Sequence, residues 1–415
     1  MKKLFALFLA CIMLFLTSCN QTPPSETTEN SQNQGNPTDT LPQGIVKNGV
    51  SDIIDTSSRI LFVNPISPKY TCYYSKVDGK AYVYCFDPLC DHAGGKCLAN
   101  PEEFYHIPNF ELSNTFFING RFYTASQYGQ IYSFSFDGSD LKIEYGDDYF
   151  PIEDRYEKQF RWSPNFCVYD KYIYIPIYAD ENGNPRILRF NTETKEMEDL
   201  TEKTGNCILP DFFYNGEIYG REFPIGDYYK TKLDLSEAEL VDSFPVVGQF
   251  YGSVFFDNAY DDFYDYDNRK TIGIQAYDMK TGEKKIITNE MLGLAEEYYT
   301  IVATDENYVY FYQYKKTVIG KIQTHWGDQD EYTTNEGKLY RVKHDGTECT
   351  LIYDNPNFEF DSREAVICGD KILIEGSEYA IGADGYVVWT SAGMQVGTIG
   401  EDGKIEKFEP IELVY

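Results

Sequence analysis

Short runs of alternating apolar and polar residues fill the chain from about residue 58 onward, and most of them end at Asp, Asn or Gly. Residues 131–138, for example, read Ile-Tyr-Ser-Phe-Ser-Phe-Asp-Gly. A period of two predicts a half-buried β-strand, and a following Asp-Gly or Asn-Gly pair predicts a turn. The pattern therefore predicts short antiparallel strands throughout, with one short helix at residues 289–297.

The strand pattern repeats along the chain. An Asn-Gly pair followed by an aromatic-rich run occurs at residues 119–123 and 215–219, and related runs begin at 170, 305 and 369. The repeats divide the chain into seven modules, at residues 58–104, 111–145, 165–201, 209–243, 251–290, 300–354 and 365–410. A period of roughly 50 residues is typical of propeller blades. We predict an all-β fold, a seven-bladed β-propeller over residues 58–415, while counts of six or eight blades stay open.

The rhythm of these modules resembles that of secreted bacterial propellers. An Asn/Asp-Gly-x-aromatic-Tyr run followed by Leu-x-x-x-Asp-x-x-Gly is similar to propellers of the low-density-lipoprotein-receptor type and of the TolB, kelch and quinoprotein-like groups. Residues 172–174 with 188–191, and residues 308–310 with 339–342, carry the resemblance. It implies a propeller fold and brings no catalytic residues with it, because this fold serves many unrelated functions.

The N-terminal segment has the pattern of an export signal. Two lysines precede an apolar run at residues 4–16, and Leu-Thr-Ser-Cys follows at residues 16–19. The run is too short for a typical membrane span, and the segment resembles a bacterial lipobox. That resemblance implies a signal peptide at residues 1–19 and lipid modification of Cys19. Residues 20–57, rich in Ser, Thr, Asn, Gln and Pro at their start, are expected to form a flexible tether.

The formal net charge of −30 limits the choice of partner. Such a surface repels nucleic acid and anionic lipid head groups, so nucleic acid is excluded as a partner. Contact with a membrane is expected through the N-terminal lipid instead. We therefore expect the protein at the bacterial cell membrane, anchored by lipid and facing away from the cytoplasm.

Half of the cysteines that follow Cys19 lie in the first module, at residues 72, 85, 90 and 97. Asp78-Gly79 between two alternating runs predicts a two-residue hairpin turn. Counting outward from that turn places Cys72 opposite Cys85. Cys90, His92 and Cys97 follow in an enlarged turn. Residues 85–97 resemble a Cys-x-Asp-Pro-x-Cys-x-His-x4-Cys element of anchored bacterial propellers.

Two interpretations of the cysteine cluster stay open. An exported protein favours disulfide bonds, here Cys72–Cys85 and Cys90–Cys97. Alternatively, the four thiolates and His92 could hold a structural zinc ion. The remaining cysteines, at residues 167, 207, 349 and 368, are expected to be small buried apolar residues. A cofactor is not expected otherwise, although the acidic stretch at residues 257–268 leaves a calcium ion open.

No sequence motif of a known catalytic centre is present. A propeller binds ligands at the face where the loops between second and third strands meet the connections between blades. Three long segments belong there, at residues 146–164, 257–270 and 315–336. They carry the candidate binding residues Trp162, Asp262, Tyr264, Asp265, His325 and Trp326. Aromatic side chains on loops suit sugars and protein partners. Trp389 is expected in the core.

These observations predict a binding or scaffold module for a glycan, peptide or protein partner. Two alternatives stay open. One is a carbohydrate-active enzyme that uses carboxylates in the axial pocket, because 66 acidic residues would hide a catalytic pair. The other is a structural component of an envelope complex.

Overall fold

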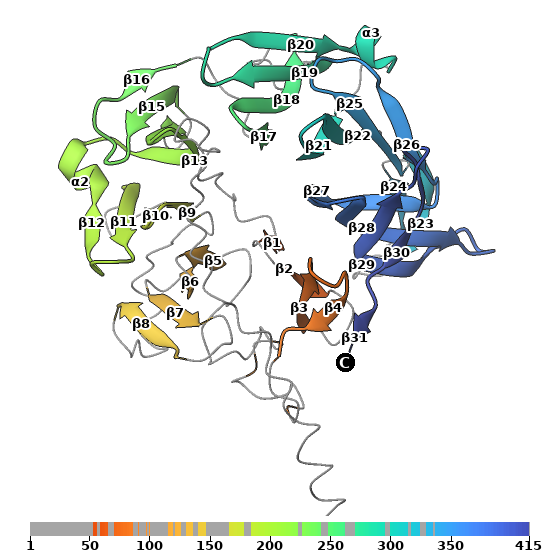
Figure 1. The fold of residues 1–415 in the computed structure, drawn as a ribbon, viewed down its shortest axis with the longest axis horizontal. Coiled ribbons are helices and arrows are strands. Elements are labelled where there is room, and N and C mark those ends of the chain that lie inside the picture. The colour runs from red at the N-terminus through yellow and green to blue at the C-terminus, as the bar shows by residue number, and fades with distance from the viewer. Residues whose placement is uncertain are drawn as a thin grey trace, which may run out of the picture. The chain divides into compact units, whose positions relative to one another are not determined.

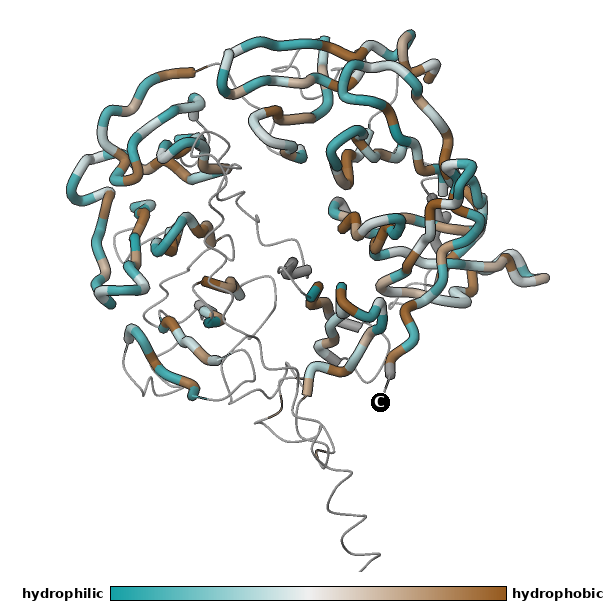
Figure 2. Tube along the Cα trace, viewed as in Figure 1, coloured by the Kyte–Doolittle hydropathy of each residue, from teal (hydrophilic) through white to brown (hydrophobic). Residues whose placement is uncertain are grey.

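The computed structural model describes residues 53–55, 59–64, 70–85, 90, 97, 99, 115–118, 121–125, 130–135, 140–146, 166–177, 184–222, 226–241, 248–261, 270–294, 299–313, 317–323, 329–334 and 337–414. Within these ranges, six four-stranded antiparallel sheets and one five-stranded sheet follow one another around a central axis (Figure 1). The predicted seven-bladed β-propeller is confirmed. Figure 2 shows hydrophobic and hydrophilic residues alternating along the blades, as the sequence pattern requires.

Each blade is a meander whose first strand lies nearest the axis. The strands of blades 1 to 4 are, in chain order, β1 (Ile53–Asp55), β2 (Arg59–Asn64), β3 (Tyr70–Ser75), β4 (Ala81–Val83); β5 (Thr115–Ile118), β6 (Arg121–Ala125), β7 (Ile131–Ser135), β8 (Lys142–Tyr145); β9 (Cys167–Tyr169), β10 (Tyr172–Ile177), β11 (Arg186–Asn191), β12 (Met197–Asp199); and β13 (Ile208–Tyr214), β14 (Glu217–Glu222), β15 (Tyr228–Lys232), β16 (Glu239–Leu240).

Blades 5 to 7 follow the same plan and carry the longest strands. Their strands are β17 (Gln249–Tyr251), β18 (Val254–Tyr260), β19 (Thr271–Asp278), β20 (Lys284–Thr288); β21 (Tyr299–Thr304), β22 (Tyr308–Gln313), β25 (Lys338–Lys343), β26 (Thr350–Asp354); and β27 (Phe358–Cys368), β28 (Lys371–Ile381), β29 (Val387–Ile399), β30 (Ile405–Pro410). A separate hairpin, β23 (Thr317–Gln323) and β24 (Gln329–Thr334), leaves blade 6 between its second and third strands.

Two short helices join blades at their outer strands. Helix α2 (Leu200–Thr204) follows blade 3, and helix α3 (Asn289–Leu292) follows blade 5. The Thr288 hydroxyl accepts a hydrogen bond from the Met291 backbone N–H at the start of α3, and Gly293 ends the helix at φ 68°. The helix predicted at residues 289–297 is confirmed over its first turn. No helix in the described ranges is both long enough and apolar enough to span a membrane.

The ring closes at blade 1. Strand β31 (Leu413–Val414) lies parallel to β4, with Leu413 opposite Ala81 and Val414 opposite Tyr82. Blade 1 therefore has four consecutive strands of its own, and the C-terminal strand adds a fifth at the outer edge. The first strand begins at Ile53, earlier than the predicted start at residue 58. Strand β1 has only three residues, too few to show an alternation of apolar and polar positions, so the sequence assigned it to the predicted tether.

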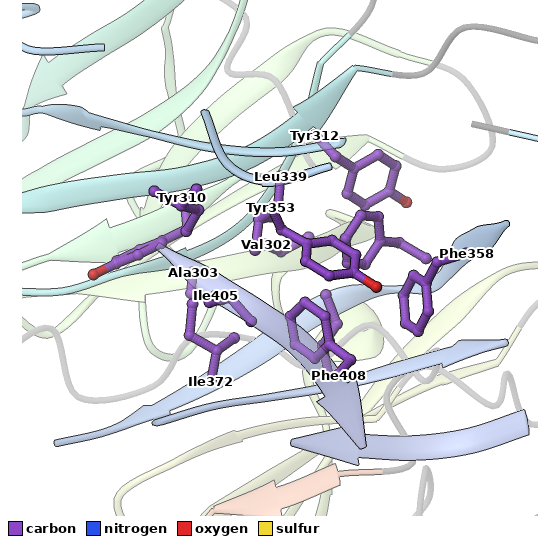
Figure 3. Packing of buried hydrophobic residues seen from close by; sticks show 13 residues of the cluster. Val302, Ala303, Tyr310, Tyr312, Leu339, Tyr353, Phe358, Ile372, Ile405 and Phe408 are labelled. Atoms are coloured by element: carbon purple, nitrogen blue, oxygen red, sulfur yellow. The ribbon is translucent and has the colours of Figure 1, made fainter. Parts of the chain in front are cut away.

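The hydrophobic core lies between neighbouring blades. In the largest cluster, Tyr310 and Tyr353 of blade 6 pack with Phe358, Ile372 and Phe408 of blade 7 (Figure 3). The Tyr353 and Phe408 rings meet edge to face, with centroids 4.7 Å apart. Such contacts bury large aromatic areas and stabilise the blade interface. The high aromatic content of the sequence thus serves blade packing.

Candidate functional site

The first candidate site is a cluster of three cysteines beside blade 1. Cys85 follows β4, and Cys90 and Cys97 lie further along the same connection. Their Sγ atoms all lie within 4.8 Å of one another. The Cys97 side chain is buried, and those of Cys85 and Cys90 are half-buried. Three of the predicted cysteines therefore lie close together.

Apolar residues surround this cluster. Val83 of β4 and Ala99 are buried beside Cys97, and Leu413 of β31 packs against the same group. Burial raises the pKa of the Cys97 thiol to about 12, although a hydrogen bond from the backbone N–H of Ala99 acts in the opposite direction. Forming a thiolate there needs a compensating positive charge, because burial disfavours the charged form.

Cys72 does not belong to this group. Residues Lys76 to Gly79 form a four-residue loop, so Cys72 of β3 lies opposite Val83. The predicted register, which placed Cys72 opposite Cys85, is wrong by two residues. The Cys72 side chain packs between blades 1 and 7 with Leu373 and Met394, and burial raises its pKa to about 12. His92 lies outside the described residues.

The remaining cysteines pack among apolar side chains, and Cys167 is buried as predicted, whereas Cys207, Cys349 and Cys368 are half-buried. Cys167 and Cys207 pack in the cluster between blades 3 and 4, Cys349 packs between blades 5 and 6, and Cys368 packs between blades 7 and 1. The Cys167 thiol is buried and donates a hydrogen bond to the carbonyl oxygen of Pro210, with a distance of 3.4 Å from S to O.

The second candidate site is the face that the sequence assigns to binding. Because strands alternate in direction, loops between second and third strands share one face with the connections between blades. The described parts of residues 257–270 and 315–336 join second and third strands, and residues 146–164 join blades 2 and 3. Outside the described residues lie the candidates Cys19, Trp162, Asp262, Tyr264, Asp265, His325 and Trp326.

On this face, hairpins from two blades contact each other. The β23–β24 hairpin of blade 6 lies beside the long β28–β29 hairpin of blade 7 (Figure 1). The Lys321 backbone N–H donates to the Gly385 carbonyl oxygen at 3.0 Å. A Cβ atom on Gly320 would lie 3.1 Å from Val387 Cγ2 and 3.2 Å from Ile381 Cδ1. A glycine at this position thus lets the two hairpins approach closely.

The paired hairpins expose apolar side chains to solvent. The exposed fractions are 53% for Val318, 45% for Ile381, 54% for Val388 and 46% for Trp389. Side chains alternate across a strand, so Ile381 and Trp389 share one face of the hairpin and Val388 lies on the other. Because Val388 lies on the opposite face, we call Ile381 and Trp389, together with Val318 of the contacting hairpin, the hairpin patch. The prediction that Trp389 lies in the core is wrong, because β28 and β29 extend beyond the packed part of blade 7.

A buried carboxylic acid lies in blade 4. Asp211 is the extra residue of a β-bulge between Pro210 and Phe212, and Gly220 lies across from that bulge. The Asp211 side chain is 6% exposed, and its Oδ2 accepts a hydrogen bond from Arg221 Nε at 3.3 Å. Burial raises the pKa of Asp211 to about 6, although the Arg221 charge opposes the shift. The sequence offered no signal for this group among the many acidic residues.

Comparisons with known proteins show no family and assign no activity. No protein-family model matches the chain, and no curated protein matches it. Among solved structures, an oligogalacturonate lyase from Vibrio parahaemolyticus is similar, with 11% identity over 89% of this chain and 93% of its own, at a TM-score of 0.44. The β-propeller domain of the Trilobed protease from Pyrococcus furiosus has 10% identity over 90% of this chain and 98% of its own, at a TM-score of 0.40.

Proposed function

We propose that the protein is a lipid-anchored, extracytoplasmic β-propeller that binds a protein or peptide partner through the hairpin patch. The observation that carries this proposal is the exposure of Val318, Ile381 and Trp389 on two hairpins that contact each other. Contiguous exposed apolar patches commonly mark sites of interaction with another protein. Tryptophan in particular is enriched among the residues that dominate protein–protein binding energy.

The way the patch is held supports a binding role. Ile381 and Trp389 extend from paired strands, and the contact between Lys321 and Gly385 ties the second hairpin to the first. Side chains on a pre-organised strand lose little conformational freedom on binding, which favours affinity. A solvent-exposed patch suits a protein surface or an extended peptide better than a deeply enclosed small molecule.

The proposed location rests on the N-terminal sequence. The lipobox pattern at residues 16–19 and the polar segment after it motivate anchoring through Cys19. Labelling of producing cells with an alkyne fatty acid tests this part. We expect the wild-type protein to carry the label and Cys19→Ala to carry none. The unlabelled variant should be recovered in the soluble fraction instead of the membrane fraction.

Site-specific photo-crosslinking tests the binding part. A photoreactive amino acid at position 389 of the anchored protein is expected to capture one protein in producing cells. The same probe at Leu240, which is 62% exposed on blade 4, serves as the matched control and should not capture it. The purified partner should then bind the wild-type protein directly, and the double variant Ile381→Ser/Trp389→Ser should bind at least tenfold more weakly, whereas Leu240→Ser should bind normally.

The same experiment separates the alternatives. Equal crosslinking from positions 389 and 240, or equal affinity of the double variant and wild type, would contradict binding through the patch. Turnover of a glycan panel by the purified protein would favour an enzyme instead.

A further inference from the structure

Three sulfur atoms converge at the outer edge of blade 1 with an arrangement that suits a metal ion. Cys85, Cys90 and Cys97 place their Sγ atoms within 4.8 Å of one another. In a tetrahedral zinc site with Zn–S distances near 2.3 Å, neighbouring sulfurs lie about 3.8 Å apart. Side-chain adjustments of the order of 1 Å bring the three sulfurs to that separation.

The number of sulfurs favours a metal over disulfide bonds. A disulfide between any two of the three leaves the third thiol beside the same apolar side chains. The cysteine that would complete a second bridge, Cys72, packs instead against Leu373 and Met394 in a different cluster. Three sulfurs that meet at one point can all bind one ion at once, and soft thiolates select zinc among the common divalent ions.

The surroundings of Cys97 also fit a metal-bound thiolate. The backbone N–H of Ala99 forms a hydrogen bond with the Cys97 sulfur. Such bonds to ligand atoms are common around protein-bound metals, where they orient the ligand and stabilise its charge. A bound cation would in turn compensate the cost of burying thiolates among Val83, Ala99 and Leu413.

We propose that Cys85, Cys90 and Cys97 bind one zinc ion, which fastens the connection after β4 to the outer edge of blade 1. Leu413 of β31 packs against this group, so the ion also supports the strand that closes the ring. The site consists of the three sulfurs, and a tetrahedral ion takes one further ligand. Its role is structural, and it is independent of binding through the hairpin patch.

Elemental analysis of the full-length protein, purified in detergent without reductant or chelator, tests the proposal. Zinc, copper and iron are measured together with the thiols that react after denaturation. We expect one zinc per chain, and reactive thiols at all three cluster positions. A Cys90–Cys97 disulfide in the non-reduced peptide map with no zinc would overturn the proposal, and one equivalent of copper or iron would overturn zinc as the metal.

Substitutions assign the ion to these residues. Cys85→Ser, Cys90→Ser and Cys97→Ser are each expected to lower bound zinc at least fivefold. Cys207→Ser and Cys349→Ser, which are half-buried outside the cluster, should keep one equivalent. Equal zinc in the Cys97→Ser and Cys207→Ser proteins would contradict the assignment.

Two measurements on the wild-type protein cover the case in which the variants do not fold. Replacement of zinc by Co²⁺ should give the near-ultraviolet charge-transfer absorption of thiolate ligands, scaled to three sulfurs. Removal of the ion with a chelator should lower the thermal unfolding midpoint, and one equivalent of zinc should restore it. A Co²⁺ spectrum without thiolate bands would overturn the site.

Discussion

Leu413 lies opposite Ala81 in a parallel pair, and this pairing joins the C-terminal strand to the outermost strand of blade 1. The Leu413 side chain also packs against the three-cysteine cluster and against the core between blades 1 and 7. Through Leu413, the strand that closes the ring therefore contacts the candidate metal site directly.

Replacement of Leu413 should weaken ring closure. The side chain is half-buried, so Leu413→Ala should lower the free energy of unfolding by about 1–2 kcal/mol, less than a fully buried leucine would. Urea unfolding measures this difference. Leu240→Ala, at a position 62% exposed, is the control and should change stability by less than about 0.5 kcal/mol. Equal losses of unfolding free energy in both variants would show that the Leu413 side chain does not stabilise ring closure.

Gly220 should be intolerant of any side chain. A Cβ atom there would lie 2.0 Å from the Leu209 carbonyl oxygen, so the bulge that holds Asp211 would have to shift. We expect Gly220→Ala to cost about 3 kcal/mol in the urea unfolding experiment. At Gly252, with φ 58° and open space around the Cβ position, alanine should cost only about 1 kcal/mol of backbone strain. An equally mild effect at both glycines would contradict the close approach.

Asp211 should make stability depend on pH. Its pKa is about 6 in the folded protein, against a usual value of 3.8. A carboxyl whose pKa is raised by folding stabilises the folded state at low pH, and this contribution is lost as the pH rises through about 6. Relative to Asp211→Asn, the wild-type protein should therefore lose about 1.4 kcal/mol between pH 5 and pH 8. Urea unfolding of both proteins at the two pH values measures the difference.

The other groups around Asp211 limit how this result is read. Arg221 Nε forms a hydrogen bond with the Asp211 carboxyl, and the Tyr228 hydroxyl faces the same carboxyl. The Cys167 thiol is near enough that, beyond the effect of burial, the charge of Asp211 raises its pKa further. Tyr228 and Cys167 have pKa values raised by burial and stay neutral over this range. A stability difference that does not change with pH would show that Arg221 holds Asp211 ionised.

Gly320→Val should separate the two hairpins without unfolding a blade. The added side chain would meet the Gly385 carbonyl oxygen, where a Cβ atom would already lie 3.0 Å away, so the contact between hairpins should open. We expect faster amide hydrogen exchange at Lys321, whose N–H bonds to Gly385, and weaker capture of the partner from position 389. Exchange at Ile187, whose N–H bonds to Thr201 in blade 3, is the control and should not change.

Strand and turn chemistry made the fold predictable. The Asn215-Gly216 pair, for example, adopts φ values of 52° and 79°, as a tight hairpin turn requires. The boundaries of blades 2 to 6 were predicted to within about four residues, whereas blade 7 begins at Phe358, before its predicted start at residue 365. The hairpin of Asp78-Gly79 shows the limit, because the dipeptide marks a turn without giving its length. The Asp78 carboxylate accepts hydrogen bonds from the Lys80 backbone N–H and the Tyr82 hydroxyl and supports a longer loop.

The candidate sites depended on contacts between distant segments, which local pattern does not encode. Cys85, Cys90 and Cys97 were recognisable by residue type and proximity in sequence. The exclusion of Cys72 followed from strand register. The hairpin patch was missed because Val388-Trp389 reads as a buried strand, and only the length of β28 and β29 places it beyond the core.

The outer position of β31 has a consequence for folding during synthesis. Blade 1 obtains all four of its meander strands from consecutive chain, so it can complete its own sheet before the later blades emerge from the ribosome. Each following blade then has a finished neighbour to pack against. Strand β31 then pairs with the outer edge of blade 1 after all blades have formed. The first blade therefore does not have to stay incomplete until the C-terminal strand has been synthesised.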